Sequence, residues 1–427
     1  MFLTEEEFVN NTETKNFSQN VSLSYHLEDR NKNVPKLRFK GYNDEWKRVK
    51  TEEIFENISI KNNPLLPVLA VTQDKGVILR ESCGINIKYE NKSLKSYKIV
   101  KPGNFIISLR SFQGGLEYSE LEGIVSPAYT ILNNKQNISY DFFKYYFKTY
   151  NFIKSLNIAV EGIRDGKQIS YNSFKDIKIA FPSLPEQEKI ASFLTLVDKK
   201  IEKQKELVEL LKKYKRGLLS AMFSQKLRFK DDKGNDYPAW EEKTLGEVTD
   251  NISYGLNAAS KDYDGENKYI RITDIDETTG KYNNSNIVSP DCVLSDEYKL
   301  KINDLLFART GASTGKTYLY NENDGKMYFA GFLIKFSIKK EYCSNFLFYI
   351  TQTYNYKKWV LIMSVRSGQP GINAKEYSKY KFLCPAYSEQ VKISNIILKI
   401  DNIIEKANII LESYNAYKKG LLQKMFI

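Results

Sequence analysis

Two stretches of the sequence carry residue types that could perform chemistry, and both lie in its second half. The run Arg309–Thr317 places glycine, serine and threonine ahead of Lys316, as a phosphate-binding loop does. Such a loop needs four residues between its glycines, whereas three separate Gly311 from Gly315, and no helical pattern follows the lysine. We interpret the run as a loop after a strand that can meet DNA phosphates, or alternatively as a plain surface turn.

The second stretch combines carboxylates with a lysine. Asp291, Glu297 and Lys299 follow the residue order of one class of metal-dependent nucleases, but their spacing is short and the first half of the chain has no counterpart. The Asn-Pro-Pro-aromatic or Asp-Pro-Pro-aromatic loop of adenine methyltransferases and a glycine-rich nucleotide loop are both missing. The single histidine, His26, lies in a polar arm, which argues against histidine-based catalysis. The sequence therefore predicts no catalytic site, and it predicts no metal site.

There remains a set of basic, amide and hydroxyl side chains, which we expect at the ends of strands and in loops. Arginine can bind guanine O6 and N7 with two hydrogen bonds, and glutamine can bind adenine N6 and N7 in the same way. Each of these residues is alternatively a surface or salt-bridge residue. The candidate DNA contacts are Arg80, Arg110, Arg164, Lys167 and Gln168 in the first half and Arg271, Arg309, Thr310, Ser313, Thr314, Lys316, Arg366 and Gln369 in the second.

Composition and charge restrict the possible partners and compartment. The net charge of +12 favours a polyanion. The charge is uneven, because residues 34–181 carry 23 basic and 15 acidic side chains whereas residues 237–384 carry 19 and 18. Four widely spaced cysteines without a Cys-x-x-Cys pair indicate a reducing compartment and argue against zinc. With no apolar run of about 18 residues and no signal pattern, we expect a cytoplasmic chain that does not contact a membrane.

One long amphipathic helix, expected over residues 186–223, must position the remaining elements. Its apolar residues recur four and three apart, which favours a coiled-coil seam. At about 1.5 Å per residue the helix would be roughly 55 Å long, so a small domain cannot bury it alone. The seam residues are Ile190, Leu194, Val197, Ile201, Val208 and Leu211.

The partner of this helix is predicted to be its own second copy. A shift of 203 residues aligns residues 182–223 with residues 385–426 without a gap, and a repeat of this kind indicates a duplicated architecture. The repeat also includes a segment at the start of each domain, since Leu37-Arg38-Phe39 and Trp46 return as Leu227-Arg228-Phe229 and Trp240. The second seam reads Ile393, Ile397, Ile400, Ile404, Ala407, Leu411 and Tyr414.

Between the repeated segments lie two inserts with a similar order of elements. Each has short β-branched runs, one aromatic-rich helix (residues 140–156 and 345–362) and a Gly/Gln loop, which suggests a mixed α/β domain with a curled sheet. The aromatic residues of these helices are interpreted as core, and they include Phe142, Phe143, Tyr146 and Tyr150 in the first and Phe346, Tyr349 and Tyr354 in the second. The expected segments are a flexible or weakly helical arm (1–33), the first domain (34–181), the first long helix (182–225), a linker with the second domain (226–384) and the second long helix (385–427).

Three features together make the chain resemble a specificity subunit of a type I restriction–modification system. Each long helix starts with Pro-x-x-x-Glu-Gln-x-x-Ile, at Pro182–Ile190 and Pro385–Ile393, and ends with Tyr-Lys-(Arg/Lys)-Gly-Leu-Leu-x-x-Met-Phe, at Tyr214–Phe223 and Tyr417–Phe426. A Leu-Arg-Phe…Trp pattern precedes each domain, and the resemblance covers about residues 34–427. It implies a non-catalytic chain with two target recognition domains, each reading half of a bipartite DNA site, on an antiparallel pair of helices with pseudo-twofold symmetry.

The resemblance also implies partners. These are double-stranded DNA, two modification subunits that carry S-adenosylmethionine and methylate adenine, and restriction subunits that carry ATP, Mg and nuclease activity, while this chain itself binds no cofactor. Two alternatives stay open: an endonuclease or NTPase in its own right, and a coiled-coil adaptor that binds protein. The helix residues expected to form the spacer or to meet the modification subunit are Phe193, Leu194, Val197, Ile201, Leu207, Leu218, Ile397, Ile400, Ile404 and Leu411.

Overall fold

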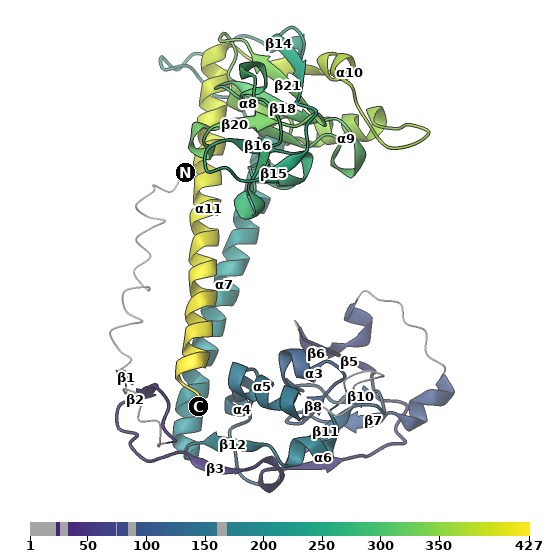
Figure 1. Cartoon of the computed structure of the whole chain (residues 1–427), viewed down its shortest axis with the longest axis vertical. Coiled ribbons are helices and arrows are strands. Elements are labelled where there is room, and N and C mark those ends of the chain that lie inside the picture. The colour runs from purple at the N-terminus through teal and green to yellow at the C-terminus, as the bar shows by residue number, and fades with distance from the viewer. Residues whose placement is uncertain (1–22, 26–32, 74, 84–90, 160–168) are drawn as a thin grey trace. The chain divides into compact units, whose positions relative to one another are not determined.

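A computed structural model of the chain describes residues 23–25, 33–73, 75–83, 91–159 and 169–427. The chain divides into two compact units, the first formed by Met1–Lys205 with Ile409–Ile427 and the second by Glu206–Asn408. Each unit contains one mixed domain and a part of each long helix, α7 (Leu184–Phe223) and α11 (Tyr387–Lys424). Both helices are labelled in Figure 1. The predicted mixed α/β class with two repeated long helices is confirmed.

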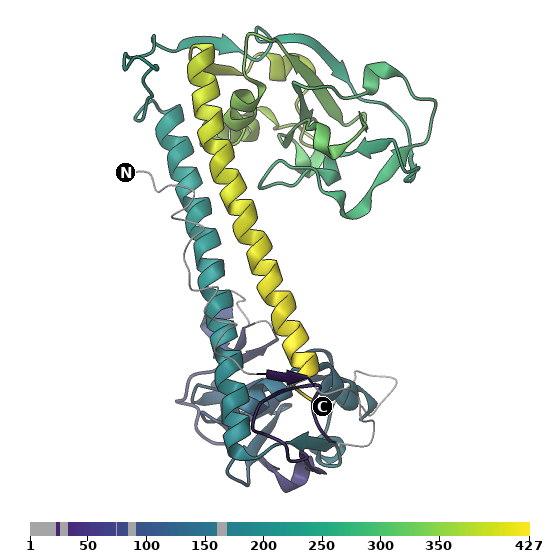
Figure 2. The ribbon, with the colours of Figure 1, turned by 90° about the vertical axis from the view of Figure 1, so that its left-hand side faces the viewer.

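The long helices are unbroken over 40 residues in α7 and 38 in α11, and Figure 2 shows each as a continuous rod. Pro185 lies in the first turn of α7, where its missing amide costs no hydrogen bond. Glu186 and Glu389 also lie in first turns, where a carboxylate is favoured by the helix dipole. Helix α7 ends at Phe223, and Gln225 then adopts a left-handed conformation (φ 58°) that stops the helical hydrogen bonding.

Each domain has its own central sheet, and the two sheets have the same strand order. The first unit has four antiparallel strands in the order β4-β11-β8-β9, and the second has β14-β21-β18-β19. The matching order shows that the duplication includes the inserts, whose sequences resemble each other only loosely. The strands are β4 (Phe55–Ile58), β8 (Phe105–Ile107), β9 (Glu117–Tyr118), β11 (Thr130–Asn134), β14 (Thr249–Tyr254), β18 (Asp304–Ala308), β19 (Thr317–Leu319) and β21 (Leu333–Ile338).

Shorter strand pairs complete each domain. In both units a strand from the start of the domain pairs with the strand just before the long helix: β3 (Lys47–Lys50) with β12 (Lys178–Phe181), and β13 (Glu241–Thr244) with β22 (Lys381–Cys384). The remaining antiparallel pairs are β5 (Leu69–Thr72) with β6 (Gly76–Leu79), β7 (Lys98–Val100) with β10 (Gly123–Val125), and β15 (Ser260–Asp262) with β17 (Val288–Pro290), while β16 (Lys268–Ile270) and β20 (Met327–Phe329) are parallel.

The prediction of one aromatic-rich helix per domain was wrong, because each region forms two helices. These are α4 (Tyr140–Tyr146) and α5 (Tyr150–Ile158) in the first unit, and α8 (Ser344–Ile350) and α9 (Tyr354–Met363) in the second. The break occurs because the hydroxyls of Thr149 and Thr353 accept backbone hydrogen bonds and so cap a new helix. The other short helices are α3 (Ser111–Gly114), α6 (Tyr171–Lys175) and α10 (Ala374–Ser378).

The N-terminal arm falls almost entirely outside the described residues. Its residues 1–22 and 26–32, with His26, are among those not described. Leu23–Tyr25 form strand β1, which pairs with β2 (Leu37–Phe39), and the sequence did not predict this strand.

The helix seams are covered by domain cores as well as by each other. Ile190, Leu194, Val197 and Ile201 pack into the aromatic core of the first unit together with residues 421–426 of the chain end. In the second unit, Leu218–Met222 of α7 packs near Ile393–Ile400 of α11, whereas Val208 and Leu211 pack near Ala407, so the helix segments run antiparallel. Within the described part of the chain, we find no helix with the length and apolar character needed to cross a membrane.

Candidate nucleic-acid interface

The repeated arginine and glutamate join each domain to the start of a long helix. Arg38 Nε and Nη2 both donate to the carboxylate of Glu186 at 2.7 Å, and the side chains are only 2% and 1% exposed. In the second unit Arg228 makes the same pair with Glu389 at 3.2 and 2.8 Å, and Trp240 Nε1 donates to Glu389 at 3.1 Å. The bond to Glu389 raises the pKa of Arg228. This pair therefore fixes the domain on its helix in both units.

The repeated glutamine makes a second attachment. Gln187 Oε1 accepts from the amide of Ser139, which caps α4, while its Nε2 donates to the carbonyl of Pro182. Gln390 does the same with the amide of Cys343 before α8 and the carbonyl of Pro385. The Pro-x-x-x-Glu-Gln motif thus has a structural role, which is to hold the first domain helix against the long helix.

Three elements of the first unit meet at Asp198 of α7. The hydroxyl of Tyr145, on α4, donates to Asp198 at 2.8 Å, and Lys418 Nζ of α11 lies 2.6 Å from the same carboxylate. The lysine also lies 5.6 Å from the centre of the Tyr145 ring. Burial, followed by the neighbouring carboxylate, raises the pKa of Tyr145. We call this cluster the aspartate junction of the first unit.

The second unit repeats this junction with residues from the other copy of each helix. Tyr349, on α8, donates to Asp401 of α11 at 3.1 Å, and Lys215 of α7 lies 2.6 Å from that carboxylate and 5.4 Å from the Tyr349 ring centre. Burial and the charge of Asp401 raise the pKa of Tyr349. Each domain is therefore tied to both long helices at a single carboxylate.

Some predicted DNA-contacting residues of the second unit come together at one cavity of about 250 Å³. Arg309 follows β18, and its Nε donates to the Gly331 carbonyl at 3.0 Å while its guanidinium lies 5.1 Å from the centre of the Tyr254 ring. Arg366 reaches the same cavity but pairs with both carboxylate oxygens of Glu376 at 2.7 Å. The cavity is lined by Arg309, Thr310, Phe332, Arg366, Gly371, Ile372 and Asn373.

The glycine-rich loop closes on the segment beside this cavity. Thr310 forms a bridge with Gly371, and the amide of Gly311 donates to the carbonyl of Pro370 at 2.9 Å. The Thr314 hydroxyl donates to the Gly311 carbonyl at 2.8 Å, and Ser313 ends a single 3-10 turn, η7 (Gly311–Ser313). The next element is strand β19, not a helix, so the loop differs from a phosphate-binding loop in structure as well as in spacing.

The remaining candidates of the second unit are not among the residues that line this cavity. Arg271 pairs with Asp274 at 2.9 Å, and this bond raises the pKa of the guanidinium. Lys316 Nζ lies 3.8 Å from Glu277. Gln369 is exposed in the loop after α9. The charges of Arg271 and Lys316 are thus partly balanced within the unit.

In the first unit, two candidate arginines share one neighbourhood. Arg80 begins a 3-10 turn, η2 (Arg80–Cys83), and Arg110 is exposed just before α3. Burial raises the pKa of Tyr129, while the charges of both arginines act on it in the opposite sense. Arg164, Lys167 and Gln168 lie outside the described residues.

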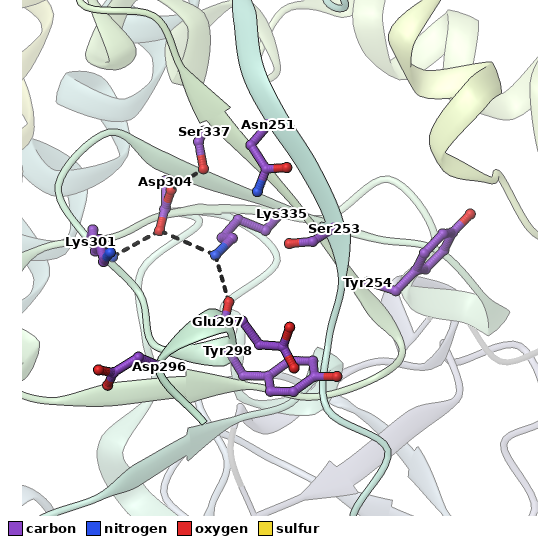
Figure 3. A pocket seen from close by; sticks show the side chains of 10 residues that line it. All are labelled: Asn251, Ser253, Tyr254, Asp296, Glu297, Tyr298, Lys301, Asp304, Lys335 and Ser337. Carbon is purple, nitrogen blue, oxygen red and sulfur yellow. Dashed lines mark hydrogen bonds and ion pairs between the residues drawn. The ribbon is translucent and has the colours of Figure 1, made fainter. Parts of the chain in front are cut away.

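A second, larger cavity of about 430 Å³ lies against the sheet of the second unit; none of the candidate DNA contacts lines it, whereas Glu297 of the nuclease-like stretch does. Figure 3 shows Lys335 at its centre, where Nζ donates to the Glu297 carbonyl at 2.9 Å and lies 4.0 Å from Asp304. Burial lowers the pKa of Lys335. The lining has three carboxylates (Asp296, Glu297 and Asp304) and two lysines, so it is poorly suited to phosphate.

The nuclease-like residues do not assemble. Asp291 is exposed and lies 4.0 Å from Lys261, and Lys299 forms a backbone bridge with Tyr328. Among the residues that the structure describes, no group of three His, Cys, Asp or Glu side chains is placed to hold a metal ion.

Comparison with known proteins gives the family. The model of the type I restriction modification DNA specificity domain matches residues 43–212 and again residues 237–412. The chain belongs to this family. Each unit therefore contains most of one specificity domain, and the match extends into the long helix that follows each insert.

Curated relatives match over part of their length. The specificity subunit of the type I restriction enzyme StySPI from Salmonella potsdam is 25% identical over 230 residues, which is 52% of this chain and 50% of that protein. The MjaIX specificity subunit of Methanocaldococcus jannaschii is 24% identical over 233 residues, which is 51% and 52%. The chain spans about half the length of the curated relatives it matches.

Solved structures share the fold. The type I restriction–modification S subunit of M. genitalium has a TM-score of 0.54 at 17% identity and covers 92% of this chain and 99% of its own. A chain from a structural study of complex assembly and conformational transition in the type I system has a TM-score of 0.55 at 15% identity, covering 89% and 97%.

The helix residues predicted as spacer or partner contacts are largely covered by the specificity domains themselves. Phe193 packs its ring against Phe39 at 5.6 Å, and Leu218 is buried in the core of the second unit. Leu194, Val197, Ile201, Ile397 and Ile400 are also buried, and Leu207, Ile404 and Leu411 are partly buried against core clusters.

Sequence reasoning missed the residues that pair with the candidates. Tyr254 stacks with Arg309 and Glu376 neutralises Arg366, yet neither residue type stands out at its position. The aspartate junctions did carry a signal, because Asp198 and Lys215 recur at the repeat distance as Asp401 and Lys418.

Proposed function

We propose that the chain is the DNA-recognition subunit of a type I restriction–modification complex in the cytoplasm, and that each specificity domain reads one half of a bipartite target. The observation that carries the proposal is the duplicated specificity domain, each copy attached through the same arginine–glutamate pair and aspartate junction to an antiparallel helix pair. Two domains of one fold with different surface side chains suit two different half-sites.

The chain contributes recognition rather than catalysis in this proposal. Adenine methylation is carried out by two modification subunits that bind S-adenosylmethionine, and cleavage by restriction subunits that use ATP and Mg. The glycine-rich loop of the second unit leads into strand β19 rather than into a helix, and the proposal assigns all cofactors to the partner subunits.

The two domains are proposed to contact DNA with different balances of forces. The first insert carries 23 basic and 15 acidic side chains, which favours phosphate contacts whose strength falls with salt. The second carries 19 and 18, so its binding depends more on placed side chains such as Arg309. Helix α7, at roughly 60 Å, is long enough to act as a spacer between major grooves one turn, about 34 Å, apart.

Selection from randomised double-stranded DNA with the chain and its modification subunit tests the proposal. We expect enriched sequences with two defined halves and a fixed gap. Exchange of residues 237–384 for another such domain should alter only one half. A single contiguous motif contradicts the two-reader proposal, no enrichment favours a protein-binding adaptor, and ATP- or metal-dependent cleavage by the isolated chain favours an enzyme.

A further inference from the structure

The second helices of the two domains, α5 and α9, are equivalent at a shift of 204 residues. Both follow a capping threonine, Thr149 or Thr353. Over residues 150–158 and 354–362 the exposed and buried positions nearly coincide. The buried pairs are Phe152 with Tyr356 and Leu156 with Val360, and the exposed pairs are Tyr150 with Tyr354, Asn151 with Asn355, Lys154 with Lys358, Asn157 with Leu361 and Ile158 with Ile362.

Identity between the copies is concentrated at the exposed positions. Both buried pairs differ in residue type, whereas four of the five exposed pairs are identical. Surface substitutions away from special features usually change stability little, so exposed positions of two diverged copies are free to differ. The folding of each domain therefore does not explain why these residues are identical. Binding of both surfaces to the same kind of partner does explain it.

The shared residues form an apolar stripe with one charge. Tyr, Lys and Ile recur every four residues, which places them along one side of a helix. Tyr150 and Ile158 are 69% and 79% exposed, and Tyr354 and Ile362 are 77% and 64% exposed. The interpretation of Tyr150 and Tyr354 as core residues was therefore wrong, although Phe142, Phe143, Tyr146, Phe346 and Tyr349 are buried as predicted.

The chemistry of the stripe fits a protein better than DNA. Exposed apolar patches mark protein interaction sites, whereas DNA interfaces are more polar and strongly basic. In the second unit Leu361 and Val365 extend the apolar surface, and they are also largely exposed. The lysine at the centre of each stripe, Lys154 or Lys358, favours a carboxylate on the partner.

We infer that the stripe Tyr150–Lys154–Ile158 on α5 and the stripe Tyr354–Lys358–Ile362 on α9, the Tyr–Lys–Ile stripes, are equivalent docking surfaces for two copies of one protein. That protein presents an apolar surface with a nearby carboxylate. The inference rests on the proposed function, in which the protein is the modification subunit. It places the contact on the specificity domains, because the apolar helix residues first expected to make it are largely covered by their own domains.

The number of modification subunits bound by the full chain tests this inference. Native mass spectrometry of the wild-type complex should give two copies. Ile158→Asp and Ile362→Asp should each give one copy, and the double variant none, because each charge replaces an anchor of one stripe and weakens that contact roughly thirtyfold or more. Leu65→Asp and Val293→Asp are matched controls at side chains 94% and 95% exposed, and both should keep two copies.

The lysine at the centre of each stripe allows a second test, which changes an electrostatic contact rather than an apolar one. Lys154→Glu and Lys358→Glu should weaken binding of the modification subunit more at low salt than at high salt. Circular dichroism should show unchanged helix content in all variants.

The outcomes separate this inference from the proposed function. A wild-type chain that binds no modification subunit overturns the proposed function. Isoleucine variants that still bind two copies overturn the inference alone. If those variants bind two copies but lose affinity for DNA, the stripes contact DNA and the inference is equally wrong.

Discussion

The buried Arg38–Glu186 pair gives a prediction for which the structure supplies a magnitude. Both carboxylate oxygens of Glu186 accept from Arg38 at 2.7 Å, and the side chains are 2% and 1% exposed. Arg38→Met leaves the Glu186 carboxylate buried without its partner, and this kind of change costs about 3–5 kcal/mol of unfolding free energy. Replacing both residues, as Arg38→Met with Glu186→Leu, should recover most of this loss, because no charge then remains buried.

The loss should be confined to the first unit. With a urea m-value of about 2–3 kcal/mol/M, the unfolding midpoint of that unit should fall by roughly 1–2 M. Lys50→Met is the matched control, because it removes an ion pair with Asp176 that is exposed on both sides, and we expect no measurable shift.

The three tryptophans allow each unit to be followed in the intact chain. Trp46 lies in the first unit, and Trp240 and Trp359 lie in the second. After 5-fluorotryptophan labelling, fluorine NMR in urea should show an early transition for Trp46 in the Arg38→Met variant, while the other two resonances move little. The unit-specific signal avoids treating a chain of two units as one two-state transition.

Two results would refute the reasoning about this pair. A loss below about 1 kcal/mol would mean that the pair behaves like an exposed salt bridge. A double variant as unstable as Arg38→Met would mean that the lost packing of the arginine, rather than the buried charge, causes the effect.

Three further predictions concern DNA binding and pH. Arg309→Ala should cost about 1–3 kcal/mol of binding to the half-site read by the second domain and leave the other preference intact, whereas equal loss on all sequences in a competition assay would make Arg309 a phosphate contact. Raising salt from about 50 to 200 mM should weaken DNA binding roughly 10³-fold if about six phosphates are contacted, and a flat response in a titration would exclude an electrostatic interface. Burial and the charge of Asp401 raise the pKa of Tyr349, so the contribution of this residue to stability is complete below about pH 10 and is lost as pH rises through the folded-state pKa. The urea midpoint of the second unit should therefore fall less steeply above pH 10 in the Tyr349→Phe variant than in the wild type. An unchanged slope would contradict this.

The helices and the duplication could be predicted because their signals are local or periodic. A seam with a 3.5-residue period and an ungapped repeat identify the long helices directly from the sequence. The Glu-Gln pair of the motif was also visible, but its role was not. Glu186 contacts Arg38 across 148 positions, and no local pattern shows which distant residue completes a buried pair.

The break between α4 and α5 shows a limit of periodicity. The aromatic residues continue with helical spacing through Thr149, so the pattern favours one helix. The structure instead uses the Thr149 hydroxyl as a cap, and the choice depends on packing of Phe147 and Phe152 into the core. In the second unit the Thr353 hydroxyl caps α9 in the same way.

The candidate interface was predictable as residue types but not as an arrangement. Arg309 and Arg366 were both expected to face DNA, and they line one cavity. The sequence did not show that Glu376 holds Arg366 or that Asp274 holds Arg271, because charge pairing depends on the folded positions of side chains. The same reason hid the buried Lys335, which a sequence pattern alone would place on the surface.

Methylation mapping tests the central claim most directly. A methylation-deficient host would express this chain with its modification subunit, and the positions of methyladenine would be read across the genome. The account predicts one split motif with two defined halves and a fixed gap. Methylation at unsplit motifs, or a stable complex of the two proteins that methylates no defined sequence, would contradict it.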